Sequence, residues 1–172
     1  MKKLFIGYIT VLVILTCTGC ISDIGKPRIS RNRQLMNTVI SAIEENDTKA
    51  LSKVLSKDLQ DKCTDFGLKK VLGAVPGKIT DIEQFTVDDA SERIKDSNNP
   101  SKESVMRRYY ISCKITNSLG NSYILKLEFI KYNEFEPQKE GISFVGVTPI
   151  DENYHQMKDT ISIGTNTALS IW

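Results

Sequence analysis

Hydrophobic side chains in the first third of the sequence recur at helical spacing. Over Asn32–Glu45 they fall three and four residues apart, which predicts a helix with one apolar stripe. A second helix is expected from Thr48, because Asp47 or Thr48 can cap its first turn. The segment Ser56–Asp58 is expected to close it, and Thr64–Leu72 is predicted to form a third, short helix. The stripe residues are Leu35, Met36, Val39, Ile40, Ile43, Ala50, Leu51, Val54, Leu55, Phe66, Leu68, Val71 and Leu72.

After Gly77 the apolar period shortens to two, which is typical of strands. The clearest alternation lies in Val105–Thr116 and Tyr123–Phe129, which predicts a pair of strands with one buried face. Lys78–Val87 alternates only in part and is expected to be a further strand. Asp88–Ser104 is rich in Asp, Ser, Asn and Lys, so we expect an exposed loop or a wide hairpin connection there. A final strand is predicted over Gly141–Pro149.

Helices followed by strands indicate the α+β class. We expect the N-terminal helices to pack on one face of a curved antiparallel sheet of about four strands. Residues 151–172 are less regular, but they retain large apolar side chains and are expected to dock against a surface. These side chains are Ile161, Ile163, Leu169, Ile171 and Trp172.

The first residues have the composition of a targeting segment. Lys2 and Lys3 form a short basic start, and an apolar run of about a dozen residues follows from Leu4 to Leu15. This run is too short for a transmembrane helix, which needs about 20 residues. The segment therefore predicts export across the cytoplasmic membrane.

The end of this segment resembles the bacterial lipobox. A small residue, Gly19, stands directly before Cys20. The resemblance implies that a diacylglycerol is added to the thiol of Cys20 and that cleavage occurs after Gly19. One departure is Cys17, which stands where the pattern prefers Leu. An ordinary secretory signal and an uncleaved anchor are the alternatives.

Cleavage at this point also changes the charge balance. The 172-residue chain has 23 Lys and Arg and 21 Asp and Glu, and Lys2 and Lys3 account for the whole excess. The mature chain is therefore close to neutral, which gives no electrostatic support for binding nucleic acid. The length suits one domain. We expect a signal peptide at 1–19, a tether at 20–33, the domain at 34–150 and an extension at 151–172.

Besides Cys20, the mature chain contains two cysteines, Cys63 and Cys113. A location outside the cytoplasm permits a disulfide between them, whereas the apolar neighbours of Cys113 also fit a buried thiol, so both pairing states stay open. The lone histidine, His155, lies in a polar stretch. Because a zinc site needs several His or Cys ligands, we predict no metal site. We also predict no cofactor, and no catalytic site built on His155.

The order of elements resembles the nuclear transport factor 2-like (cystatin-like cone) domains. The resemblance rests on the helix break within Ala42–Leu51, on Pro76–Thr80 and on Gly141-Ile142, and it covers about residues 33–150. The whole chain is similar to small uncharacterised lipoproteins of Gram-positive bacteria. Some cone domains are isomerases or dehydratases, which makes Asp65, Tyr109 and Tyr123 candidates for an Asp base with Tyr donors.

Our leading hypothesis is a lipid-anchored, non-enzymatic protein on the outer face of the cell membrane. It would bind an envelope ligand or a protein partner, and the alternative is a cone-fold isomerase or dehydratase. A ligand would occupy the concave side of the sheet. Partner binding would instead use an exposed apolar patch around Ile161 to Trp172. The candidate pocket residues are Tyr109, Ile111, Tyr123, Leu125, Leu127 and Phe129.

Overall fold

A computed structural model describes residues 26–165 of the chain, with side chains from residue 30 onward. Its contacts divide the chain into one unit at 1–34 and a second at 35–172. Helix α2 (Lys26–Glu45) runs across this boundary, and α3 (Thr48–Val54), α4 (Lys57–Lys62) and α5 (Asp65–Leu72) follow in the second unit.

The helices differ from the predicted ones at two places. Helix α2 begins at Lys26 and not at Asn32, so part of the predicted tether is helical. The turns of α2 before Asn32 lack an apolar stripe, and the predicted start of the helix rests on that stripe. The segment predicted to close the second helix instead begins α4, because the Ser56 hydroxyl accepts a hydrogen bond from the backbone N–H of Leu59 at 3.2 Å. Ser56 is thus a helix cap, a role that its type also favours.

Asp47 confirms its predicted role as the cap of α3. Its Oδ1 accepts hydrogen bonds from the backbone N–H groups of Lys49 at 2.9 Å and Ala50 at 3.0 Å. We expect Asp47→Ala to lower the free energy of unfolding by about 1 kcal/mol, because both N–H groups lose this acceptor. Urea unfolding measures the change. Asp61→Ala is the control, since it removes only an exposed ion pair with Lys57, and an equal loss in both variants would contradict the capping role.

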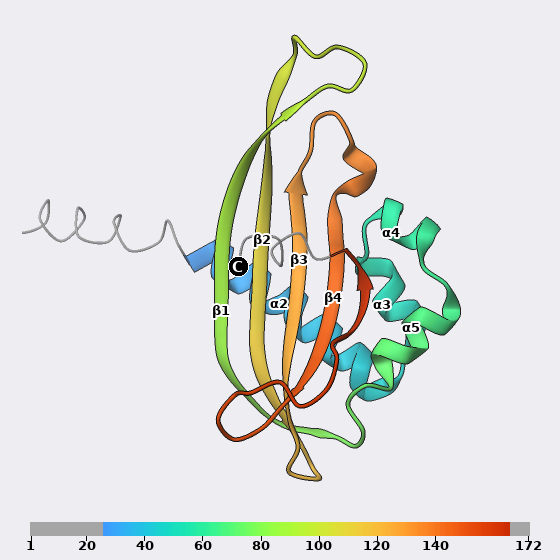
Figure 1. Cartoon of the computed structure of the whole chain (residues 1–172), viewed down its shortest axis with the longest axis vertical. Helices are drawn as coiled ribbons and strands as arrows, with labels where there is room; N and C mark the ends of the chain where they lie inside the picture. Colours follow the sequence, from blue (N-terminus) through green and yellow to red (C-terminus); the bar gives the residue numbers. More distant parts are fainter. Residues whose placement is uncertain (1–25, 166–172) are drawn as a thin grey trace, which may run out of the picture. The chain divides into compact units, whose positions relative to one another are not determined.

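Five strands follow the helices and form one antiparallel sheet. They are β1 (Ile79–Lys95), β2 (Glu103–Asn117), β3 (Ser122–Tyr132), β4 (Gly141–Ile150) and β5 (Ile161–Gly164), with a short 3-10 helix, η1 (Pro137–Lys139), before β4. Their order in the sheet is their order in the chain. The described residues therefore confirm the α+β class, with helices first and an open sheet after them (Figure 1).

The sheet differs from the predicted one at two places. The polar segment from Asp88, predicted as a loop or a wide hairpin connection, is a hairpin in which β1 continues as far as Lys95, paired with β2 without interruption from Thr86. Most of these residues are exposed, so no apolar alternation marks the strand. The second difference is β5, a fifth strand that pairs with β4 and lies in the extension that the sequence left irregular.

The core combines side chains from the helices and the sheet. Across four strands, Ile111, Leu127, Val145 and Ile163 stand opposite one another in register. They belong to one cluster with Val39, Leu51, Leu68 and Val71 of the helices. The helical segment also bonds directly to β4, since the backbone N–H of Ser56 donates to the carbonyl oxygen of Ile142 at 2.8 Å.

Gly141 makes this approach possible. Its φ is +116°, and a Cβ placed there would lie 2.9 Å from the backbone of Ser56. A side chain at this position would therefore force β4 and the α3–α4 junction apart.

Candidate functional site

The predicted acylation residue, Cys20, lies outside the described residues, as do Leu169, Ile171 and Trp172 of the predicted docking segment. Ile163 of the same segment is buried in the core at 6% exposure. Within residues 26–165 no helix is long and apolar enough to cross a membrane.

The six candidate pocket residues lie in the core region of the sheet. Tyr109, Ile111, Tyr123, Leu125 and Leu127 are buried, and Phe129 is half-buried against the same cluster. The rings of Tyr109 and Phe129 stack with their centroids 6.4 Å apart. Side chains of α2, α3 and α5 belong to this cluster, which favours a structural role for the six residues over the lining of a ligand pocket.

The two tyrosine hydroxyls reflect this burial. Burial raises the pKa of Tyr123 above its ordinary value. The hydroxyl of Tyr109 is buried and has no hydrogen-bond partner among the described residues. The enzyme hypothesis also requires Asp65 inside an apolar pocket, but Asp65 stands exposed in the first turn of α5. The arrangement therefore lacks the enclosed carboxylate and donor pair that such chemistry needs.

Both cysteines of the second unit are free thiols. Burial raises the pKa of Cys113 to about 11, which keeps it protonated near neutral pH. Cys63 is half-buried, and its pKa is raised chiefly by burial and also by the nearby charge of Asp65. Neither environment favours a thiolate, so neither cysteine has the character of a nucleophile.

His155 lies in the loop between β4 and β5. Its Nδ1 is 3.3 Å from Oδ2 of Asp151, and its ring is 78% exposed. Asp151 also accepts the backbone N–H groups of His155 and Asn153 at 2.8 Å. These bonds, led by that from the His155 backbone, hold the pKa of Asp151 below its ordinary value. The pair thus organises an exposed loop and is not shielded as a catalytic pair would be.

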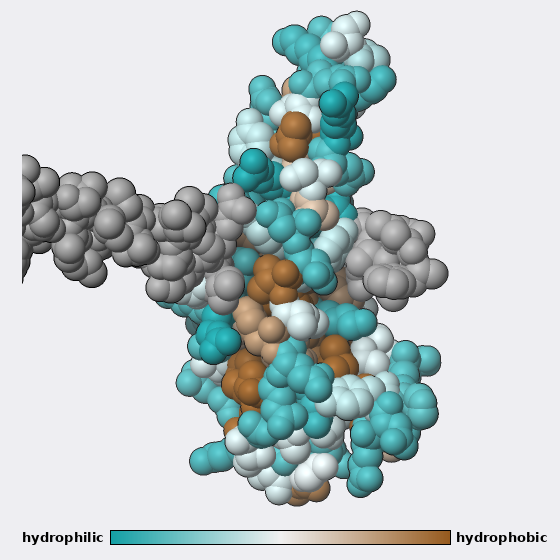
Figure 2. Space-filling model, turned by 90° about the vertical axis from the view of Figure 1, so that its left-hand side faces the viewer, coloured by the Kyte–Doolittle hydropathy of each residue, from teal (hydrophilic) through white to brown (hydrophobic). Residues whose placement is uncertain are grey.

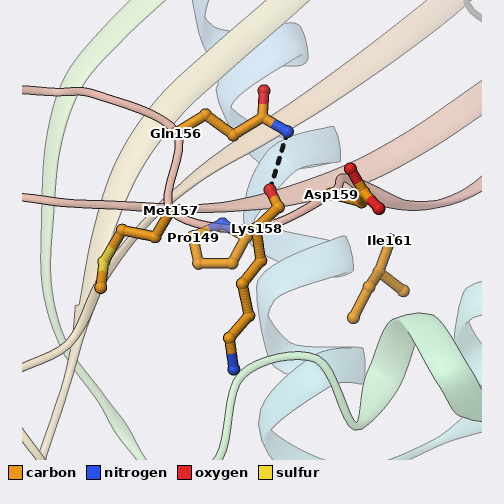
Figure 3. A pocket seen from close by; sticks show the side chains of 6 residues that line it. All are labelled: Pro149, Gln156, Met157, Lys158, Asp159 and Ile161. Carbon is orange, nitrogen blue, oxygen red and sulfur yellow. Dashed lines mark hydrogen bonds between the residues drawn. The ribbon is translucent and has the colours of Figure 1, made fainter.

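A shallow hollow lies beside this loop. It encloses about 600 Å³ and is open to solvent. Figure 3 shows that Gln156, Met157 and Lys158 point away from one another, while Gln156 Nε2 donates to the Lys158 carbonyl oxygen at 2.7 Å. The hollow shares no residue with the predicted pocket. Its lining residues are Pro149, Gln156, Met157, Lys158, Asp159 and Ile161.

Acidic residues of the predicted loop do not gather for a cation. Asp88 and Asp89 lie in β1, and Asp96 accepts the backbone N–H of Asn98 in the turn that follows. No group of three or more His, Cys, Asp or Glu side chains among residues 26–165 is placed to hold a metal ion.

Two strands of the sheet extend beyond their neighbours. Pairing of β2 with β3 ends at Arg107, whereas pairing of β2 with β1 continues to Glu103 and Lys95. Residues 92–106 therefore form a two-stranded arm that extends past β3 and β4 (Figure 1). Its tip is ordered by its own side chains, since Asp96 and Asn99 each accept a backbone N–H two residues on.

A buried ion pair lies near the base of the arm. Nη1 of Arg108 is 3.1 Å from Oε1 of Glu128, and their side chains are 10% and 2% exposed. From the sequence, pairing of Arg108 or Lys114 with Glu128 across the exposed faces is possible, but the register is not fixed. In the structure Arg108 forms this pair, but in a buried position, and Lys114 pairs with Glu83 of β1 instead.

Comparison with known proteins places this fold in a family. No curated protein matches the chain. A family model described as a domain of unknown function, DUF5104, matches residues 38–152, which is about two-thirds of the chain. The match extends from α2 through β4 and includes the arm. The chain therefore belongs to the DUF5104 family.

Proposed function

We propose that this protein is an extracytoplasmic lipoprotein, held on the cell membrane by an acylated Cys20, that binds a protein partner at the envelope without catalysing a reaction. The basic start, the short apolar run and the Gly19-Cys20 junction support the anchor. Two or three acyl chains give stable membrane attachment. The proposal includes a cystatin-like cone of the kind found in lipoproteins of Gram-positive bacteria, with the helices on the concave face of the sheet.

The arm at residues 92–106 is the observation that favours a protein partner. An isolated pair of strands is only marginally stable in water, because it cannot bury much apolar surface. Val105 is 44% exposed on this arm, and Tyr132 is 45% exposed at the end of β3. An exposed two-stranded element with apolar side chains is suited to contact another protein, which would bury both.

The edge of the sheet adds to this surface. β1 is an edge strand, so its outer backbone groups pair with no strand among the described residues. Figure 2 faces this edge and shows small apolar patches set among polar side chains, with a largely hydrophilic arm above them. Non-obligate interfaces are about as apolar as the rest of a protein surface, so this mixed composition is compatible with one. By contrast, the six candidate pocket residues belong to the core or pack against it.

Site-specific photocrosslinking in intact cells tests the partner. A photoreactive residue at Val105 is expected to crosslink one envelope protein reproducibly. The same residue at Leu119, which is 67% exposed in the turn between β2 and β3, is the matched control and is expected to give no such product. Arg93→Glu on the arm should abolish the product while leaving the melting temperature unchanged. Identical products from both positions, or none from position 105, would refute binding through the arm.

A further inference from the structure

Helix α5 exposes an aromatic side chain beside two lysines. Phe66 is 77% exposed, whereas Leu68, Val71 and Leu72 of the same helix are buried. Lys69 and Lys70 follow Phe66 by three and four residues and are also exposed, so the three side chains share one face of the helix. An exposed phenylalanine has a cost in water that a nearby apolar phase would remove.

Helix α3 packs against α5 and contributes two more exposed lysines, Lys49 and Lys53, one turn apart. The structure gives none of these four lysines an ion pair within residues 30–165. The lysines of the neighbouring helix α4 differ, since Lys57 and Lys62 each pair with an aspartate one turn away. Asp65 is the one acidic residue within α3 and α5, so the two helices together carry a net positive charge.

We propose that α5, with α3 beside it, docks on anionic lipid headgroups of the membrane that holds the acylated chain. The proposal rests on the proposed function, because the anchor keeps the folded unit close to that surface. Uncompensated lysines complement anionic headgroups. The adjacent Phe66 supplies an apolar side chain for the headgroup boundary, where buried apolar area adds to the electrostatic attraction of the lysines. An acidic protein surface would match the lysines, but a lipid boundary accommodates both the charges and the ring.

Fluorescence quenching by brominated lipids tests the docking. The lipidated protein carries Phe66→Trp in a Trp172→Phe background, so that position 66 holds the single indole. It is reconstituted in phosphatidylcholine vesicles, alone or mixed with phosphatidylglycerol, with bromine on the acyl chains. We expect quenching severalfold stronger in the anionic vesicles, and loss of this difference at high salt.

Matched charge reversals give the control. Lys69→Glu with Lys70→Glu is expected to abolish the quenching, whereas Lys57→Glu with Lys62→Glu, which changes the net charge equally on α4, is expected to retain it. An indole at position 66 that is quenched no more in anionic than in neutral vesicles overturns the proposal and leaves an acidic protein as the occupant. Equal loss in the two charge reversals also overturns it, because net charge alone would then explain binding.

Failure of the anchor and failure of the docking give different experimental results. The incorporation of palmitate reports acylation at Cys20, whereas quenching at position 66 reports the contact of α5 with lipid. If acylation is absent, anionic vesicles added to the unacylated protein still quench the indole. If docking is absent, an acylated protein floats with both kinds of vesicle and its indole remains unquenched.

Discussion

Glu128→Gln is expected to lower the free energy of unfolding by about 3 kcal/mol. Gln keeps the shape of the side chain and can still accept the Ser143 hydroxyl, which donates to Oε1 at 3.1 Å. It removes the negative charge that lies 3.1 Å from Arg108. A second carboxylate, that of Glu92, pairs with Arg108 at 3.5 Å but is 61% exposed. The loss therefore comes from an almost buried guanidinium deprived of its buried counter-charge.

Urea unfolding of the full chain measures this effect. Glu83→Gln is the control, because it breaks the Lys114–Glu83 pair on the exposed part of the sheet and should change stability little. The paired replacement of Arg108 by Met and Glu128 by Leu is expected to recover most of the loss, since neither charge then remains buried. A Glu128→Gln variant as stable as the control would contradict the buried position of the ion pair.

Leu125→Ala is expected to cost about 3 kcal/mol, the range found when a large buried aliphatic side chain is truncated. Leu125 is fully buried, and it stands opposite Cys113 on β2 and Val147 on β4. Its neighbours in the core come from both the helices and the sheet, so they cannot collapse easily into the space left by the truncation.

This variant also distinguishes a core from a pocket. If Leu125 lined an open cavity, its truncation would enlarge the cavity and change stability only slightly. Val105→Ala, on the exposed arm, is expected to change the free energy of unfolding by less than about 0.5 kcal/mol. Thermal or urea unfolding that gives equal effects for the two variants would contradict the assignment of Leu125 to the core.

The elements that could be predicted from the sequence are those with one buried apolar face and one exposed polar face. The strands containing Cys113 and Leu125 alternate over Tyr109–Ile115 and Tyr123–Leu127, and the structure pairs these two residues directly across β2 and β3. Asp47 was one of two predicted caps, with Thr48, because either side chain before an apolar stripe can cap a helix without knowledge of the rest of the fold. The information in such patterns is contained within a few neighbouring residues.

The elements that were missed lack this signal. The end of β1 is exposed, so its sequence shows no apolar alternation. It is recognisable as a strand only from its hydrogen bonding to β2. Helix α4 has only six residues with one buried leucine, which is too short for a stripe. The arm was not predicted for the same reason, because a polar segment does not show whether it is a loop or a pair of hydrogen-bonded strands.

The candidate site shows a different limit. Alternation identified the inward side chains Tyr109 and Tyr123, and both are buried. It could not indicate whether helices or a ligand would fill the space against them, because that depends on long-range packing. The face of Phe66, Lys69 and Lys70 was likewise hidden, since Phe66 fitted an apolar stripe and only the three-dimensional structure shows it exposed.

Radiolabelled palmitate incorporation tests the central claim, the lipid anchor at Cys20, most directly. The full chain is produced in a bacterium that acylates lipoproteins, and label is compared between wild type, Cys20→Ala and Cys17→Ala. We expect label in the wild type and in Cys17→Ala, with none in Cys20→Ala, and the unlabelled variant should leave the membrane fraction if its signal segment is cleaved. Equal labelling of the two cysteine variants, or an unlabelled wild-type protein, would contradict the anchor.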